Sequence, residues 1–241
     1  MDHLNGSLLL GVIPIVIPGL PPDMEENSSD RSDAQEAPPK PRTDKIGTEL
    51  TSDTPIDEPL PPDLQVALAR YLGTDSVETL RQWTKSLRDV VGDGAITVDA
   101  LCLASEQTPH RGVMGDQTYY FACFYDAVIL AAIAGTPVYI RTVSPQGVDI
   151  RAKACGTDVL EVEHRESVFS FGIDRHVDSP GEAEPSIHTG YEAICPYVKA
   201  FPKVDAYHRW AGTVAAPTVA LPLAGATELA AALSSNAPCD G

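Results

Sequence analysis

Residues 121–137, FACFYDAVILAAIAGTP, predict the helix around which the rest of the chain is organised. Apart from its first residues the stretch is apolar on every face, which is typical of a helix buried in a core. Gly135 and Pro137 end it, because glycine favours a helix terminus and proline cannot continue the helix. Cys123 and Asp126 at its start do not fit a purely apolar helix, so they are candidate functional residues.

Cys123 and Asp126 have a spacing that places them on one face of the helix. We expect Cys123 in the first turn, where unsatisfied N–H groups and the helix dipole stabilise a thiolate. A thiolate beside a carboxylate in apolar surroundings is a like-charge pair, so one of the two should hold a proton. Asp126 is therefore a candidate proton donor and Cys123 a candidate nucleophile or soft-metal ligand. The alternative is structural: a space-filling thiol and a carboxylate that only complements the dipole.

Alternating segments on both sides of this helix predict strands. One strand at 118–122 leads into the helix, and strands at 138–144, 148–154, 158–164 and 167–173 should form one antiparallel meander after it. A helix from residue 188 bends at Cys195 because Pro196 follows. A helix at 205–212, a strand within 213–223 and a closing helix at 225–235 complete the chain.

The N-terminal half contains a region with almost no large apolar residues, from Pro21 to about Pro62, which should be disordered. Three short helices are expected after it: one at 63–72, a second that ends at Val91, and a third at 97–106. The predicted class is α+β: a small helical N-terminal unit, then a mostly antiparallel sheet core with flanking helices. The predicted domains are residues 1–59 (extension), 60–110 (helical unit), 111–236 (core) and 237–241 (frayed tail).

The chain is strongly acidic, with 17 Lys and Arg against 34 Asp and Glu and a formal net charge of -17. Such a surface repels phosphates and anionic membranes, so no nucleic-acid or membrane partner is expected. The acidic residues also occur throughout the folded part, which favours a cytoplasm of high ionic strength. The apolar stretch 7–22 contains Pro14 and Pro18 and lacks a basic flank, so we interpret it as neither an anchor nor a leader. A cytoplasmic location is expected.

Five cysteines without a CxxC pair argue against a disulfide scaffold, a zinc ribbon or a thioredoxin motif. The spacing of the histidines also predicts no zinc site. Cys102 is expected in the core and Cys239 in the tail. Cys155 precedes a glycine at a turn, where exposure would make it the rival of Cys195 as a second reactive thiol.

Two stretches resemble the organomercurial lyases, the alkylmercury lyase (MerB) family. The first is YYFACFYDAVILAAIAGTPVYIRTVSPQG at 119–147, in which an aromatic strand, the Cys-x-x-Asp helix, a glycine, a strand and a second glycine follow one another. The second is AICPYVKAFPKVDAYHRWAG at 193–212, in which Cys195 precedes Phe201 and Trp210. The resemblance covers roughly residues 95–235.

The resemblance implies a MerB-like core and a function: protonolysis of the carbon–mercury bond of R–Hg⁺ to a hydrocarbon and Hg(II). Cys123 and Cys195 would be the mercury ligands and Asp126 the proton donor. Mercury is substrate and product, no cofactor is implied, and free low-molecular-weight thiols are needed for turnover. A mercuric reductase is a possible acceptor of the Hg(II). Thiolates suit this role because soft metals prefer sulfur ligands.

The chain departs from the family pattern in several places. The family's winged-helix-like N-terminal region is reduced to short helices here, and the acidic extension is additional. Ser144 stands where many members carry a third cysteine, and Pro196 follows Cys195 where many have an adjacent cysteine. Two rival functions stay open: a thiol-based mercury or soft-metal binding protein without lyase activity, and a redox protein in which Cys123 and Cys195 form a reversible disulfide.

Overall fold

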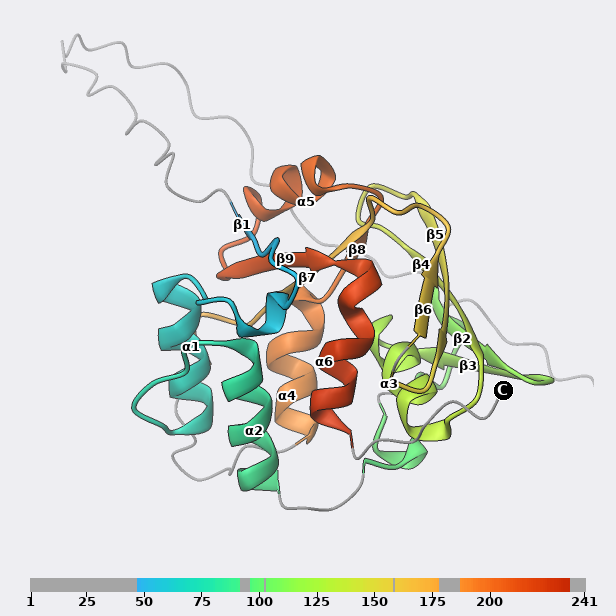
Figure 1. Ribbon diagram of the computed structural model, residues 1–241, viewed down its shortest axis with the longest axis horizontal. Coiled ribbons are helices and arrows are strands. Elements are labelled where there is room, and N and C mark those ends of the chain that lie inside the picture. The colour runs from blue at the N-terminus through green and yellow to red at the C-terminus, as the bar shows by residue number, and fades with distance from the viewer. Residues whose placement is uncertain (1–46, 92–95, 102, 158, 178–186, 235–241) are drawn as a thin grey trace, which may run out of the picture. The chain divides into compact units, whose positions relative to one another are not determined.

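The computed structural model describes residues 47–91, 96–101, 103–157, 159–177 and 187–234. Within these ranges two β-sheets and six α-helices form an α+β fold, as expected (Figure 1). No helix in these ranges combines the length and the apolar character that crossing a membrane requires. The predicted tail at 237–241 lies outside the described residues, as do residues 1–46 of the predicted extension.

A five-stranded antiparallel sheet forms one side of the fold, with the strand order β3-β2-β4-β5-β6. Four of its strands agree with the expected segments: β3 (Gln117–Phe121), β4 (Val138–Val143), β5 (Asp149–Cys155) and β6 (Val159–Val162). The strand β2 (His110–Met114) was not expected, because the predicted strands begin at residue 118. Gly115 has a φ of 57°, and this left-handed conformation closes the β2–β3 hairpin.

A four-stranded sheet has the order β1-β9-β7-β8 and contains β1 (Thr48–Glu49), β7 (Val168–Gly172), β8 (Ala200–Phe201) and β9 (Thr218–Pro222). The prediction that 167–173 continues the meander is wrong, because β7 pairs with β8 and β9. Every residue of β7 is buried, whereas β6 alternates between more and less exposed positions. A strand that is buried on both faces belongs in the interior of a sheet. β7 has such a position between β9 and β8, whereas a place after β6 would put it at the edge of the five-stranded sheet.

The helix α3 (Tyr125–Ala134) packs against the five-stranded sheet and against α6 (Ala226–Leu233). Gly135 ends it in the left-handed conformation, with a φ of 63°, which confirms the predicted end of the helix. Ala127, Leu130 and Ala131 have no exposed surface. This helix is therefore the centre of the core, as its sequence predicts.

The helices α1, α2, α4 and α6 lie on the side of α3 away from the five-stranded sheet (Figure 1), whereas α5 packs on β7, β8 and β9. Figure 1 shows α2, α4 and α6 between α1 on the left and α3 on the right. Their bounds are α1 (Pro62–Leu72), α2 (Leu80–Val91), α4 (Ile187–Ile194) and α5 (Val204–Ala211), and the short 3₁₀ helices are η1 (Pro55–Asp57), η2 (Val98–Ala100), η3 (Cys195–Tyr197) and η4 (Leu223–Gly225). Because α2 contacts both α1 and α6, the N-terminal helices pack on the C-terminal part of the chain.

The N-terminal region differs from the prediction in two respects. The fold begins before residue 60, because β1 pairs in parallel with β9 and both Leu50 and Ile56 are buried. The helix expected at 97–106 is also wrong: of the described residues in this range, three form the short η2 and none is α-helical. The backbone N–H of Ala104 instead bonds to the carbonyl of Tyr120 at 2.8 Å, so this segment runs beside β3. The predicted boundary at residue 110 falls within β2.

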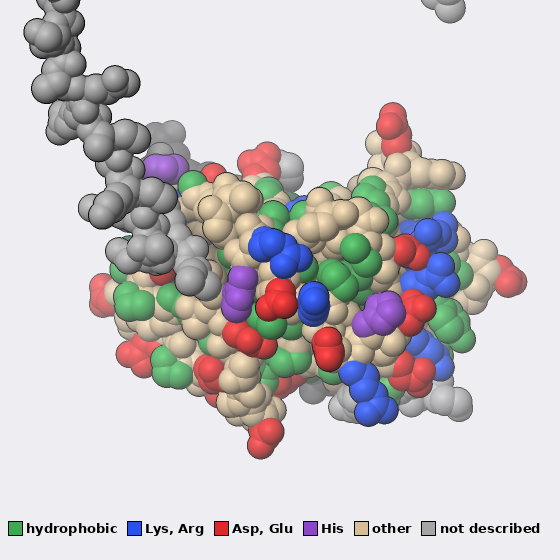
Figure 2. Space-filling view, turned by 90° about the horizontal axis from the view of Figure 1, so that it is seen from above, with side chains coloured by type: hydrophobic (Ala, Val, Ile, Leu, Met, Phe, Trp, Pro, Cys, Tyr) green, Lys and Arg blue, Asp and Glu red, His purple; other side chains and the backbone are tan. Residues whose placement is uncertain are grey.

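Charged side chains on the five-stranded sheet lie on its outer face. Arg111, Arg141 and Arg151 occupy paired positions on β2, β4 and β5, an arrangement of like charges that is destabilising on its own. Asp149 offsets it by bonding to Arg141 at 2.5 Å and to Arg151 at 3.0 Å. These two hydrogen bonds hold the pKa of the Asp149 carboxyl below its ordinary value. Figure 2 shows Lys and Arg side chains gathered with acidic ones on the right of that view.

Candidate functional site

Cys123 lies in the short turn that joins β3 to α3. Its side chain is buried, with 2% of the residue exposed, and its S–H donates to the carbonyl oxygen of Val198 over 3.9 Å. The helix begins at Tyr125, so Cys123 precedes the first turn in which it was expected, and Phe124 is the N-cap residue. The thiol still lies beside the N-terminal end of α3, where the helix dipole favours negative charge.

Asp126 is the second residue of α3, and only 2% of it is exposed. Burial of an ionised carboxylate is costly unless partners compensate for the lost water. A carboxylate that only complements a helix dipole does so equally well at the surface. The burial of Asp126 therefore favours a functional role over a purely structural one.

Cys195 is positioned by the break between two helices. The helix α4 ends at Ile194, and the 3₁₀ helix η3 begins directly at Cys195 with Pro196 as its second residue, so the predicted bend is confirmed. The backbone N–H of Val198 bonds to the Cys195 carbonyl at 3.2 Å and closes this turn. Cys195 is half-buried, and it is thus the more accessible of the two cysteines.

Ser170 on β7 fixes the segment that follows Cys195. The Ser170 residue is completely buried, and its hydroxyl donates to the carbonyl of Tyr197 at 2.7 Å. The same hydroxyl accepts the backbone N–H of Lys199 at 3.0 Å. Val198 lies between these two residues and carries the carbonyl that accepts from Cys123. One buried hydroxyl therefore fixes the backbone segment that carries both Cys195 and the carbonyl bonded to the Cys123 thiol.

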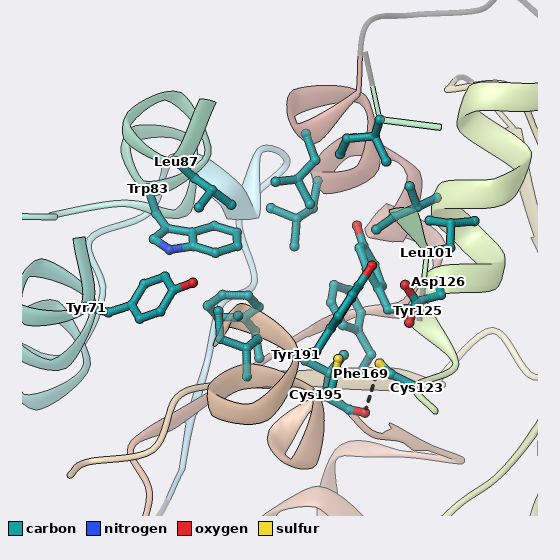
Figure 3. Close-up of a pocket in the computed structure, with 18 residues that line it drawn as sticks. Tyr71, Trp83, Leu87, Leu101, Cys123, Tyr125, Asp126, Phe169, Tyr191 and Cys195 are labelled. Atoms are coloured by element: carbon teal, nitrogen blue, oxygen red, sulfur yellow. Dashed lines mark hydrogen bonds between the residues drawn. The ribbon is translucent and has the colours of Figure 1, made fainter. Parts of the chain in front are cut away.

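The structure brings the three predicted site residues together. One sulfur from Cys123, one from Cys195 and a carboxylate oxygen of Asp126 all lie within 4.8 Å of one another (Figure 3). In zinc sites each sulfur lies about 2.3 Å from the metal, so two thiolates on one ion are at most about 4.6 Å apart. Mercury is a larger ion. The two sulfurs are thus close enough to bind one mercury atom with small adjustments.

The other cysteines and histidines do not join this cluster. Cys155, the rival for the second thiol, is buried at the end of β5 rather than exposed, and it is disulfide-bonded. Cys102 and Cys239 are outside the described residues. His110 contacts Thr142 through its Nδ1. Among the residues that the structure describes, no second group of three His, Cys, Asp or Glu side chains converges as this one does.

A cavity of about 120 Å³ opens next to the three side chains. Apart from Asp126, its lining contains no side chain that carries a charge. The lining residues are Tyr71, Trp83, Leu87, Ile96, Leu101, Cys123, Tyr125, Asp126, Ile129, Phe169, Phe171, Gly190, Tyr191, Ile194, Cys195, Val198, Leu229 and Leu233. Electrostatic interactions are strong in such surroundings because little water screens them.

Several lining residues could not be identified as such from the sequence. One of them is Tyr125, the first residue of α3. Its ring stacks on Phe169 with centroids 5.5 Å apart, and its hydroxyl donates to the Ala226 carbonyl at 2.5 Å. Burial, and then the negative charge of a Cys123 thiolate, raise the pKa of Tyr125 well above its ordinary value. The Tyr125 hydroxyl therefore stays neutral in the working pH range.

The arrangement as a whole suits the chemistry of a soft metal. Two thiols can capture a soft cation, a carboxyl beside them can transfer a proton, and the apolar cavity can hold a water-insoluble group attached to the metal. This combination is different from a structural zinc site, in which four ligands close around the ion. Here two sulfurs and one carboxyl face an open cavity.

The comparison with protein families agrees with this chemistry. The model of the family described as alkylmercury lyase matches residues 103–235, which is more than half of the chain. A solved structure, "Crystal structure of the mercury-bound form of MerB2", is 13% identical in sequence, with a TM-score of 0.41, and the match covers 72% of this chain and 91% of that chain. No curated protein matches the chain.

Proposed function

Since the chain belongs to the alkylmercury lyase family, we propose that Cys123, Asp126 and Cys195 carry out the cleavage of the carbon–mercury bond. The substrate is an organomercurial R–Hg⁺, which reaches the site bound to a small thiol. The observation that carries the assignment is the convergence of two sulfurs and one buried carboxyl within 4.8 Å at the edge of an apolar cavity.

The reaction begins with the exchange of sulfur ligands on mercury. One protein thiol gives its proton to the departing small thiolate and takes its place on the metal. The second protein thiol transfers its proton to the Asp126 carboxylate and becomes the second sulfur ligand. Both sulfurs now hold the R–Hg unit, and Asp126 is a carboxylic acid beside the carbon atom that is bonded to mercury.

Proton transfer from Asp126 then completes the cleavage. The electron pair of the carbon–mercury bond forms the new carbon–hydrogen bond, and R–H leaves as a neutral hydrocarbon. Mercury stays as Hg(II) between the Cys123 and Cys195 thiolates, and Asp126 is again a carboxylate. The two thiol protons are thereby accounted for: one is on the released small thiol and the other is in the hydrocarbon. The cycle uses no cofactor.

The cavity supports both steps. Its apolar lining holds the organic group, and the exclusion of water strengthens the attraction between mercury and the thiolates. Release of Hg(II) requires competing sulfur ligands. Because Cys195 is more exposed than Cys123, small cytoplasmic thiols, or the cysteines of a mercuric reductase, would reach the metal from the Cys195 side.

The test is to incubate the protein with methylmercury or phenylmercury and excess thiol, at low and at high salt, and to measure methane or benzene. Asp126→Asn should lower the rate of hydrocarbon release by about 10²- to 10⁴-fold, which is the usual contribution of a general acid. The variant should still bind Hg(II) stoichiometrically. Asp205→Asn is the matched control, because Asp205 is an exposed acidic residue in the first turn of α5.

Each outcome of this test discriminates between the functions. No hydrocarbon from the wild-type protein, together with tight Hg(II) binding, would show a sequestering protein instead of a lyase. A reversible Cys123–Cys195 disulfide without mercury chemistry would favour the redox alternative. Full activity of Asp126→Asn would remove the proposed proton donor, even if the lyase activity itself were confirmed.

A further inference from the structure

The far wall of the cavity comes from a part of the chain that the family model does not match. The matched residues are 103–235, whereas Tyr71 lies on α1 and Trp83 and Leu87 lie on α2. Figure 3 shows these three side chains at the opposite end of the cavity from Cys123, Asp126 and Cys195. The groups that react and the groups that meet the far end of the substrate thus belong to different segments.

Trp83 is the largest side chain of this wall. It is 3% exposed, and its indole contacts Phe171 edge-on, with ring centroids 4.9 Å apart and an interplanar angle of 62°. A buried tryptophan usually donates its N–H to an acceptor, but Nε1 of Trp83 has none among the described residues. The position therefore uses the aromatic surface of the indole and not its hydrogen bond.

The position of Trp83 is fixed by the packing of α2. Leu80, three residues earlier, is completely buried. Arg81 bonds to Asp57 at 2.5 Å and to Glu228 on α6 at 3.3 Å, and these contacts hold α2 against η1 and α6. The indole is thus a preformed surface rather than a side chain that has to be ordered by the substrate.

Aromatic rings also form the walls between Trp83 and the sulfurs. Phe169, Phe171, Tyr125 and Tyr191 all line the cavity, and the Tyr191 hydroxyl is engaged with the carbonyl of Ala100. The cavity of about 120 Å³ is close in size to an engineered cavity of about 150 Å³ that binds benzene in another protein. One six-membered ring therefore fits. The lining holds no cation that could pair with an anionic substituent.

We propose that Trp83 determines the specificity of this chain, and that its preferred substrates are neutral organomercurials with a single aromatic ring on mercury. The proposal rests on the lyase function proposed above. The ring of the substrate would meet the indole face and the Phe171 edge, as aromatic pairs do elsewhere in protein cores. An alkyl group of the same size gains the apolar burial but not these ring–ring contacts.

The test compares phenylmercury with cyclohexylmercury, which are similar in size, and uses methylmercury as a substrate too small to need the far wall. Aryl and alkyl carbon–mercury bonds differ in intrinsic reactivity, so the measured quantity is the change in the phenyl-to-cyclohexyl ratio of kcat/KM. Trp83→Leu should lower this ratio roughly tenfold, because the loss of a well-placed aromatic pair corresponds to about that factor. The change should appear as a higher KM for phenylmercury. The variant's activity on methylmercury, which does not reach the far wall, should fall less than its activity on phenylmercury.

Trp210→Leu is the matched control, because Trp210 is the other of the two tryptophans in the chain and packs on Phe201 and Tyr207 away from the cavity. It should leave the ratio unchanged. Trp83→Phe keeps an aromatic ring in the wall. It should admit 1-naphthylmercury, which the wild type should reject, with at least a tenfold gain in kcat/KM.

An unchanged phenyl-to-cyclohexyl ratio in Trp83→Leu, with methylmercury still cleaved, would overturn the specificity role and leave the lyase function intact. If Trp83→Leu does not fold, failure of Trp83→Phe to accept 1-naphthylmercury would overturn it equally. Absence of cleavage of every substrate by the wild type would instead contradict the proposed function itself. The two failures are therefore distinguishable.

Discussion

Acid should destabilise this protein through the buried histidine His110. Its residue is 9% exposed, and its Nδ1 lies 2.6 Å from the Thr142 hydroxyl across β2 and β4. Burial, and then the positive charge of Lys199, lower the pKa of His110 from 6.5 to about 4 in the folded protein. The unfolded chain therefore binds a proton in a pH range in which the folded protein does not.

The sign and the size of the effect follow from this difference. A histidine whose pKa is lowered on folding contributes no penalty above pH 6.5, and it costs stability progressively as the pH falls from 6.5 to about 4. The full cost is about 3 kcal/mol, at about 1.4 kcal/mol for each pKa unit. Between pH 7 and pH 5 the loss should be about 2 kcal/mol.

The assay is urea unfolding at pH 7, 6 and 5 for the wild type and for His110→Asn, whose amide can still bond to Thr142. The wild type should lose about 2 kcal/mol more than the variant over this range. His164→Asn, at an exposed position, is the control and should behave as the wild type does. If His110→Asn loses the same free energy as the wild type on acidification, the assignment to His110 is wrong.

Three further substitutions test other contacts. Ser170→Ala removes the hydroxyl that holds Tyr197 and Lys199. It should lower the free energy of unfolding in denaturant by about 1–3 kcal/mol and weaken Hg(II) binding in competition with a dithiol. Unchanged Hg(II) affinity would refute the link between Ser170 and the site. Gly172→Ala would place a methyl group 2.6 Å from Thr218 Cγ2 and 2.7 Å from the Pro217 carbonyl oxygen; we expect a loss of about 1–3 kcal/mol, and a wild-type Tm would contradict this packing. Arg81→Gln breaks two ion pairs of a half-exposed side chain, so the loss should stay below about 1 kcal/mol and vanish in about 1 M salt; a larger, salt-independent loss would show that Arg81 acts through packing.

The sequence was informative where chemistry and local structure coincide. The apolar run after Asp126 predicts a buried helix, and Gly135 with Pro137 marks its end, because these residues have few other conformational choices. The bend at Cys195 also follows from local rules, since Pro196 cannot continue α4. Neither rule indicates that Cys195 lies beside Cys123. That expectation came from the family resemblance alone.

The features that the sequence did not predict depend on tertiary burial. The period of two in 167–173 identifies a strand, but it does not say which sheet the strand joins; the complete burial of β7 decides that. Trp83 gave no functional signal either, because an apolar face at helical spacing is the same whether it fills a core or lines a cavity. Only the position of α2 relative to Phe171 distinguishes the two cases.

The reacting groups and the far wall of the cavity come from different segments of the chain, so the preference for the organic group can change while the chemistry stays the same. Both sulfurs and the carboxyl lie where helices begin or end, and the buried hydroxyl of Ser170 holds the backbone between the sulfurs. The far wall is formed by α1 and α2, which contribute Tyr71, Trp83 and Leu87 to the lining of the cavity. Replacement of one wall residue therefore alters the space for the organic group without moving the backbone that carries the thiols. Substitution at Ser170 should have the opposite effect: Hg(II) binding weakens, and the preference among organic groups stays the same.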